Sequence, residues 1–87
     1  MLSNFGMSKL AEECGELIQV AMKAAALGGL GKHWDGTYLI ERLEEEMADV
    51  LAICRLVREK HALNHERMKD RADRKYELFQ EWDKSPN

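Results

Sequence analysis

The stretch Gly28-Gly29-Leu30-Gly31, with Gly36 close behind it, divides the sequence into two parts that each permit long helices. The single proline is Pro86, so proline interrupts neither part before its last residues. A chain of 87 residues makes one domain at most, and a domain this small tends to be marginally stable alone. We therefore expect an all-α fold in a single domain over 1–87, a short bundle of three main helices that is completed by oligomerisation.

The composition is typical of a soluble folded chain, with 33% charged and 45% hydrophobic residues. The net charge of −3 and the absence of a basic block argue against nucleic acid, because phosphate-backbone binding needs clustered Lys and Arg. No apolar run approaches the roughly 20 residues that span a bilayer. The start of the sequence also lacks the charged and apolar regions of a signal peptide. We expect a cytoplasmic protein with neither nucleic acid nor a membrane among its partners.

The spacing of apolar residues predicts a first helix over about 7–27. We expect Ser8 or Ser3 to be its N-cap and Gly28 to be the left-handed residue that ends it. An apolar stripe steps by three and four along this helix and is expected to face the core. It consists of Leu10, Cys14, Leu17, Ala21 and Ala24.

Two further helices are expected after the glycine-rich stretch. The second begins near Thr37 and continues to about Lys60, and the third opens at its cap Asn64 and ends near Asp83. The inward residues of the second are expected to be Ile40, Leu43, Met47, Val50, Cys54 and Val57. Those of the third are expected to be Met68, Ala72, Lys75, Phe79 and Trp82.

Two acidic pairs border these apolar stripes. Glu13 and Glu16 are three residues apart on the first helix, as Glu46 and Asp49 are on the second, so each pair projects to one side. If the helices pack antiparallel, the pairs meet face to face and repel, since unit charges ~4 Å apart interact by about 4 kcal/mol at an effective dielectric near 20. A cation resolves that conflict. The alternative is a solvated acidic face, because Glu is a good helix former.

The donor set indicates which cation such a site would hold. Carboxylate oxygens suit Mg²⁺, with Mn²⁺ as a possible substitute, whereas zinc sites prefer His and Cys at spacings that this sequence lacks. Mg²⁺ commonly keeps waters and takes substrate phosphates as further ligands. The sequence therefore predicts a magnesium site that also binds phosphate groups.

The acidic motifs resemble those of the MazG-like nucleoside triphosphate pyrophosphohydrolases, an all-α superfamily. The likeness extends from about Leu10 to Trp82. It is carried by the segments Glu12-Glu13-Cys14-Gly15-Glu16-Leu17 and Glu45-Glu46-Met47-Ala48-Asp49-Val50-Leu51. The resemblance implies that the metal ligands are Glu13, Glu16, Glu46 and Asp49. It also implies Mg²⁺-dependent hydrolysis of a (d)NTP between the α and β phosphates, giving a (d)NMP and pyrophosphate.

The sequence departs from this family in two respects. It begins almost at the metal helix, where many relatives have a preceding helix that helps to hold the base, and the interval between the acidic motifs is long. Base-binding residues therefore do not carry over, and we expect a neighbouring subunit in a homodimer or homotetramer to complete the pocket. The remaining candidate for stacking on a base is Trp34, although a hydrophobic plug that closes the end of the bundle is the favoured role for this side chain.

Three cations are candidates for binding the substrate phosphates. Lys23 continues the carboxylate side of the first helix, and Lys75 interrupts the apolar stripe of the third. The alternative for Lys75 is that its ammonium extends to water along its methylene stem. Arg71 lies next to that stripe, where it can also pair with acidic residues of its own helix.

Glu12 and Glu45, each adjacent to a ligand pair, are the candidates for the general base that accepts a proton from the attacking water. Two other functions remain open. One is a non-catalytic helical interaction module whose acidic rows face solvent. The other is the same fold acting on another nucleotide, such as dUTP, dUDP or phosphoribosyl-ATP.

Overall fold

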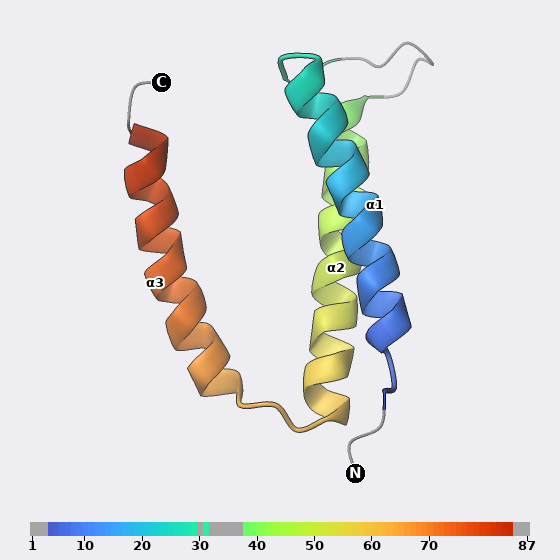
Figure 1. Ribbon diagram of the computed structural model, residues 1–87, viewed down its shortest axis with the longest axis vertical. Helices are drawn as coiled ribbons and strands as arrows, with labels where there is room; N and C mark the ends of the chain where they lie inside the picture. Colours follow the sequence, from blue (N-terminus) through green and yellow to red (C-terminus); the bar gives the residue numbers. More distant parts are fainter. Residues whose placement is uncertain (1–3, 30, 32–37, 85–87) are drawn as a thin grey trace.

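A computed structural model of the chain describes residues 4–29, 31 and 38–84. These residues form three helices in the order α1 (Met7–Ala26), α2 (Leu39–Lys60) and α3 (His65–Lys84) (Figure 1). The prediction of an all-α chain with three main helices is confirmed, and none of the described residues forms a strand segment. No helix in this part of the chain combines the length and the apolar character that crossing a bilayer requires.

Glycines set both ends of α1. Its N-cap is Gly6, with φ 79°, and a Cβ built there would lie 2.8 Å from Cγ2 of Val57. The predicted cap Ser8 was wrong, because Ser8 lies inside the helix, and the alternative Ser3 lies outside the described residues. At the other end, the prediction for Gly28 is confirmed by its φ of 75°. Backbone N–H groups of the two glycines after Leu27 donate to carbonyls of the last turn, which ends the helix cleanly.

The connection between α2 and α3 is a tight elbow over residues 61–64. The N–H of Leu63 donates to the carbonyl of Arg58 at 2.9 Å, and Ala62 takes the left-handed position with φ 52°. Asn64 then caps α3, as predicted, because its side-chain oxygen accepts a 2.9 Å hydrogen bond from the N–H of Arg67. The predicted start of α2 at Thr37 lies outside the described residues.

α1 and α2 form an antiparallel hairpin that contains the core (Figure 1). The buried residues of the described chain are Val20, Leu39, Ile53, Val57 and the acidic Glu13. Of the predicted inward residues, Val57 is buried, whereas Ile40 and Met47 are about half exposed and Ala21 is exposed. Apolar residues occupy more than one side of each helix, and the hairpin uses a side that is rotated from the predicted one.

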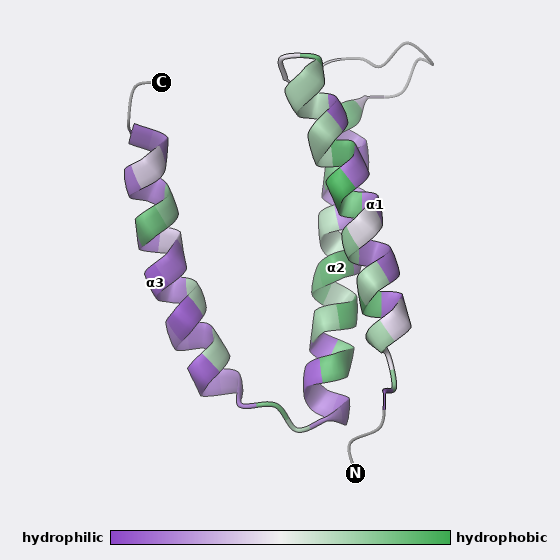
Figure 2. Cartoon of the chain, in the orientation of Figure 1, coloured by the Kyte–Doolittle hydropathy of each residue, from purple (hydrophilic) through white to green (hydrophobic). Residues whose placement is uncertain are grey.

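α3 diverges from the hairpin and buries no residue (Figure 1). The predicted inward stripe of α3 was therefore wrong for the single chain, because Met68, Phe79 and Trp82 remain 44%, 52% and 61% exposed. Figure 2 shows that hydrophobic residues concentrate on the hairpin and that α3 is largely hydrophilic. The radius of gyration is 15.8 Å, against about 12 Å for a compact domain of this length. The single chain is therefore an open arrangement of a packed hairpin and an unpacked helix.

Candidate metal centre

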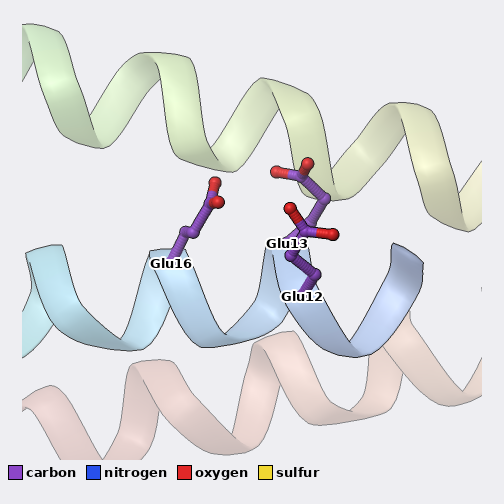
Figure 3. Close-up of side chains that lie close together, drawn as sticks. All are labelled: Glu12, Glu13 and Glu16. Carbon is purple, nitrogen blue, oxygen red and sulfur yellow. The ribbon is translucent and has the colours of Figure 1, made fainter. Parts of the chain in front are cut away.

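The acidic pairs of α1 and α2 meet inside the hairpin. Carboxylate oxygens of Glu13, Glu46 and Asp49 lie within 4.8 Å of one another, as do those of Glu12, Glu13 and Glu16. Glu13 belongs to both groups and so joins the two helices. In Figure 3, the side chains of Glu13 and Glu16 project from α1 toward α2, with Glu12 beside them. The four predicted ligands therefore fall into two overlapping groups that share Glu13, one on α1 and one that spans both helices.

Glu13 is the most buried of these acids, with 8% of its surface exposed. One of its oxygens lies 3.1 Å from Nζ of Lys9. Its other oxygen, Oε2, is buried and has no hydrogen-bond partner among the described residues, and the same holds for Oε2 of Glu46. A buried acceptor without a partner is costly, and more so when it carries charge. These two oxygens are therefore suited to a positively charged ligand that lies between the helices.

The electrostatics of the cluster favour the same conclusion. The negative charge of Glu13 is the largest cause that raises the pKa of Glu16, followed by loss of solvation and by the charge of Glu46. The neighbouring carboxylates thus oppose the ionisation of Glu16. A bound divalent cation reverses this effect, because it stabilises every ionised carboxylate around it.

Lys9 is a member of the site that the sequence reasoning missed. Its Nζ lies 3.1 Å from Glu13 and 3.5 Å from Glu12, and the hydrogen bond to Glu13 is the largest cause that raises the pKa of Lys9. The signal was present in the sequence, because Lys9 precedes Glu12 by three residues and Glu13 by four. Lys9 therefore partly neutralises Glu13, the buried member of the cluster.

A depression of about 420 Å³ opens beside the carboxylates. Lys9, Glu13 and Asp49 form its polar side, and its apolar side consists of Ala52, Ile53 and Leu56. Charged and apolar walls therefore meet directly at the acidic cluster. Such a surface has room for a phosphate group next to the carboxylates and for an apolar group next to Leu56.

The candidate general bases differ in their positions. Glu12 lies in the cluster, and its side chain is 57% exposed. Glu45 is exposed and belongs to neither group of converging carboxylates in the described chain. Glu12 is therefore the better placed of the two to exchange protons with a water near the cluster.

The candidate phosphate ligands are not brought to the cluster within one chain. Lys23 is exposed at the end of α1, two turns beyond Glu16. Arg71 borders a separate depression of about 530 Å³ near the elbow, and Lys75 lies on α3, where it is half-buried. Trp34, the candidate for base stacking, lies outside the described residues.

Comparisons with known proteins return no match: no family model, no curated protein and no solved structure resembles the chain closely enough to be significant. The resemblance of the acidic motifs to MazG-like enzymes thus stays a prediction. The geometry of the carboxylate cluster is the principal guide to function.

Proposed function

We propose that this protein is a Mg²⁺-dependent nucleoside triphosphate pyrophosphohydrolase of the MazG-like type, hydrolysing a (d)NTP to a (d)NMP and pyrophosphate. The observation that carries the proposal is the convergence of Glu13 of α1 with Glu46 and Asp49 of α2, with an unpartnered oxygen of Glu13 buried there. An acidic face that served only solubility would leave those oxygens in water. The choice of reaction rests on the likeness of the acidic motifs to that superfamily.

The donor set fits Mg²⁺. Every member of the two converging groups in the described chain is a carboxylate, and hard oxygen donors of negative charge suit Mg²⁺ and Mn²⁺ better than zinc. Glu13, Glu16, Glu46 and Asp49 would hold the ion. When bound, it neutralises charge on the phosphates and lowers the pKa of a coordinated water.

The residues of the chain then divide the remaining tasks. Glu12, exposed at the edge of the cluster, accepts a proton from the attacking water, with Glu45 as the second candidate. The water adds to the α phosphorus, the bond to the bridging oxygen breaks, and pyrophosphate leaves with the bonding electrons. Lys9 loses its role as counter-ion to Glu13 when a divalent ion is present. Because Lys9 also lines the depression, its ammonium would then be free to bind a phosphate oxygen there.

Substitution of the α2 ligands tests the proposal. Glu46→Gln and Asp49→Asn should each lower pyrophosphate release from a panel of nucleotides by at least about 100-fold, since both remove a negative ligand of the metal. Glu41→Gln is the matched control, because Glu41 is exposed on the same helix and lies outside the cluster. Circular dichroism should show unchanged helicity in all three variants, and the rise in Tm on addition of Mg²⁺ should persist in the control alone.

Three outcomes are distinct. Full turnover in both Glu46→Gln and Asp49→Asn would exclude this site. Absence of pyrophosphate release from any nucleotide, together with no Mg²⁺-dependent change in Tm, would favour the helical interaction module. Preference for dUTP, dUDP or phosphoribosyl-ATP within the panel would keep the site and change the substrate.

A further inference from the structure

A further depression, of about 380 Å³, lies between α2 and α3 where the two helices approach each other at the elbow (Figure 1). It shares no lining residue with the depression beside the carboxylates. Its charged and polar lining is basic and consists of Arg55 and Arg58 of α2 and His65 and Lys69 of α3; no acidic residue of the described chain lines it. We call it the basic depression. In a chain with a net charge of −3, it is a local reversal of charge.

Arg58 is a half-buried cation without a partner. It forms neither an ion pair nor a side-chain hydrogen bond with any residue that the structure describes. The adjacent Glu59 is engaged by Arg55, whose hydrogen bond is the largest cause that lowers the pKa of Glu59, whereas the charge of Arg58 is the smallest. A partly desolvated charge without a counter-charge is unfavourable. The guanidinium of Arg58 is therefore available to an anion from outside the chain.

The N-terminus of α3 adds to the positive character of the basic depression. His65, which lines it, is the first residue of this 20-residue helix. The free N–H groups of a first helical turn carry partial positive charge and suit anions. The side chain of Asn64 accepts a hydrogen bond from the N–H of Arg67, but the N–H groups of His65 and Glu66 have no acceptor in the described chain. The ring of His65 offers a further N–H donor.

The rest of the basic depression is apolar. Leu51 of α2 and Met68 of α3 contribute to this part of its lining, and they are 70% and 44% exposed. Covering exposed apolar side chains is favourable, in proportion to the area that is removed from water. The volume of the depression is in the lower part of the range of about 300–1,000 Å³ that is usual for small-molecule sites. A small ligand with both an anionic and an apolar group would contact both parts of the lining.

We propose that the basic depression binds a small organic phosphate, with the phosphate group on Arg58, His65 and the N-terminus of α3 and the apolar group on Leu51 and Met68. A guanidinium matches the oxygens of a phosphate through two parallel hydrogen bonds, which makes Arg58 the principal contact. Binding here requires no metal ion. It is also separate from the proposed function, because the acidic cluster repels anions as long as no divalent cation is bound.

Arg55 and Lys69 are the outer cations of the basic depression. Arg55 lies 2.6 Å from Glu59 and Lys69 lies 2.9 Å from Asp73, each pair within one helix. All four side chains are at least half exposed, and exposed pairs of this kind contribute little to stability. Both cations can therefore turn toward a bound phosphate at small cost.

A ligand in the basic depression would hold α3 against α2. Because α3 buries no residue of its own, its attachment to the hairpin depends on the elbow. A ligand that contacts Arg58 on one helix and His65 on the other adds a second attachment. Amide hydrogen exchange in the first turns of α3 should therefore slow when the ligand binds.

Calorimetric titration in a chelating buffer tests the proposal, with adenosine monophosphate as the probe. It should bind at least about 10-fold more tightly than inorganic phosphate or adenosine, because each of these fills one part of the lining only. Arg58→Gln and His65→Gln should each weaken its binding about 10-fold through loss of a hydrogen bond to a charged group. Lys84→Gln is the matched control, since it removes a positive charge at the far end of α3. Circular dichroism checks the helicity of each variant.

Chemical-shift mapping of the wild-type protein locates the ligand without any substitution. The amide signals of Arg58 and His65 should move on addition of adenosine monophosphate, whereas those of Lys9 and Glu13 should not. Movement at Lys9 and Glu13 alone would overturn the proposal. So would equal affinity for adenosine monophosphate and inorganic phosphate, or affinities of Arg58→Gln and His65→Gln that match that of Lys84→Gln.

The two proposals fail separately. Binding of adenosine monophosphate at the basic depression by a protein that releases no pyrophosphate from any nucleotide with Mg²⁺ would support this inference and contradict the proposed function. Pyrophosphate release by a protein that binds no adenosine monophosphate in the chelating buffer would contradict this inference alone.

Discussion

The two helices of the α1–α2 hairpin and the single helix α3 are nearly equal in length, but they are stabilised in different ways. The hairpin buries four apolar side chains between its two helices. α3 buries none and is supported by the Asn64 cap and by local ion pairs such as Lys69 with Asp73. Pairs of that kind contribute only about 0.2–0.5 kcal/mol each, and an isolated helix of this length is marginal in water. The periodic spacing of apolar residues therefore predicts that a segment is helical, whereas the burial of those residues depends on a second element that packs against them.

The first test of this contrast is the same truncation made in both regions. Leu39→Ala, at a fully buried position of α2, should lower the free energy of unfolding by about 2–5 kcal/mol at every protein concentration. Leu78→Ala, at a position of α3 that is 38% exposed, should cost less than about 1 kcal/mol. Urea unfolding followed by circular dichroism measures both. A larger loss for Leu78→Ala would mean that α3 has a core of its own.

Phe79→Ala should give a smaller effect of a different kind. Phe79 is 52% exposed and its ring lies 5.3 Å from that of Trp82, so the pair forms an aromatic patch on α3. If that patch docks on a second copy, its truncation should weaken association by about 1–2 kcal/mol and lower Tm only where the protein associates. Sedimentation and melting over a dilution series measure this. A loss that does not depend on concentration would assign Phe79 to the single chain, and Glu77→Ala is the control.

The smallest effect is expected at Glu16, within the hairpin. Because Glu13 raises the pKa of Glu16, the folded chain binds a proton at Glu16 more tightly than the unfolded chain does. The stability from that proton is present below the ordinary carboxyl pKa and is lost as the pH rises through the raised value. Without divalent ions at about pH 7, Glu16→Gln should therefore raise Tm slightly, and the gain should vanish near pH 4.

Thermal melts in a chelating buffer measure the effect of Glu16→Gln, with Glu44→Gln as an exposed control on α2. On addition of Mg²⁺ the wild-type protein should have the higher Tm, because it binds the ion with a carboxylate that the variant lacks. A fall in Tm for Glu16→Gln in the absence of metal would show that repulsion among the carboxylates does not govern this site.

Local signals predicted the elements of the fold well. The end of α1 at Gly28 and the start of α3 at Asn64 were predictable, because these residues satisfy the free backbone groups of the helix ends locally. The sequence did not predict which side of α1 faces the core, because α1 has apolar residues on the side of the buried Val20 and also on the side of the exposed Ile18. Periodicity alone cannot tell which of two apolar rows packs within the chain. The predicted stripe of α3 was wrong because α3 buries no residue in the single chain.

The proximity of the carboxylates was accessible from the sequence, because spacing places Glu13 with Glu16 and Glu46 with Asp49, and antiparallel packing brings the pairs together. Their role as metal ligands stays a prediction. Lys9 was not predicted as a site residue, although it lies one turn before Glu13 and pairs with it. The positions of Arg71 and Lys75 depend on where α3 lies, which no local pattern encodes.

Ala62 has a further consequence. Glycine is the usual residue at a left-handed helix end, and an L side chain there costs about 1–2 kcal/mol, yet alanine occupies this position with φ 52°. Alanine samples fewer backbone conformations than glycine, so Ala62 restricts the direction in which α3 leaves α2. A helix whose exit direction is already restricted loses less conformational entropy on binding than one on a flexible linker. Ala62→Gly would therefore make the connection between α2 and α3 more flexible while relieving the local strain.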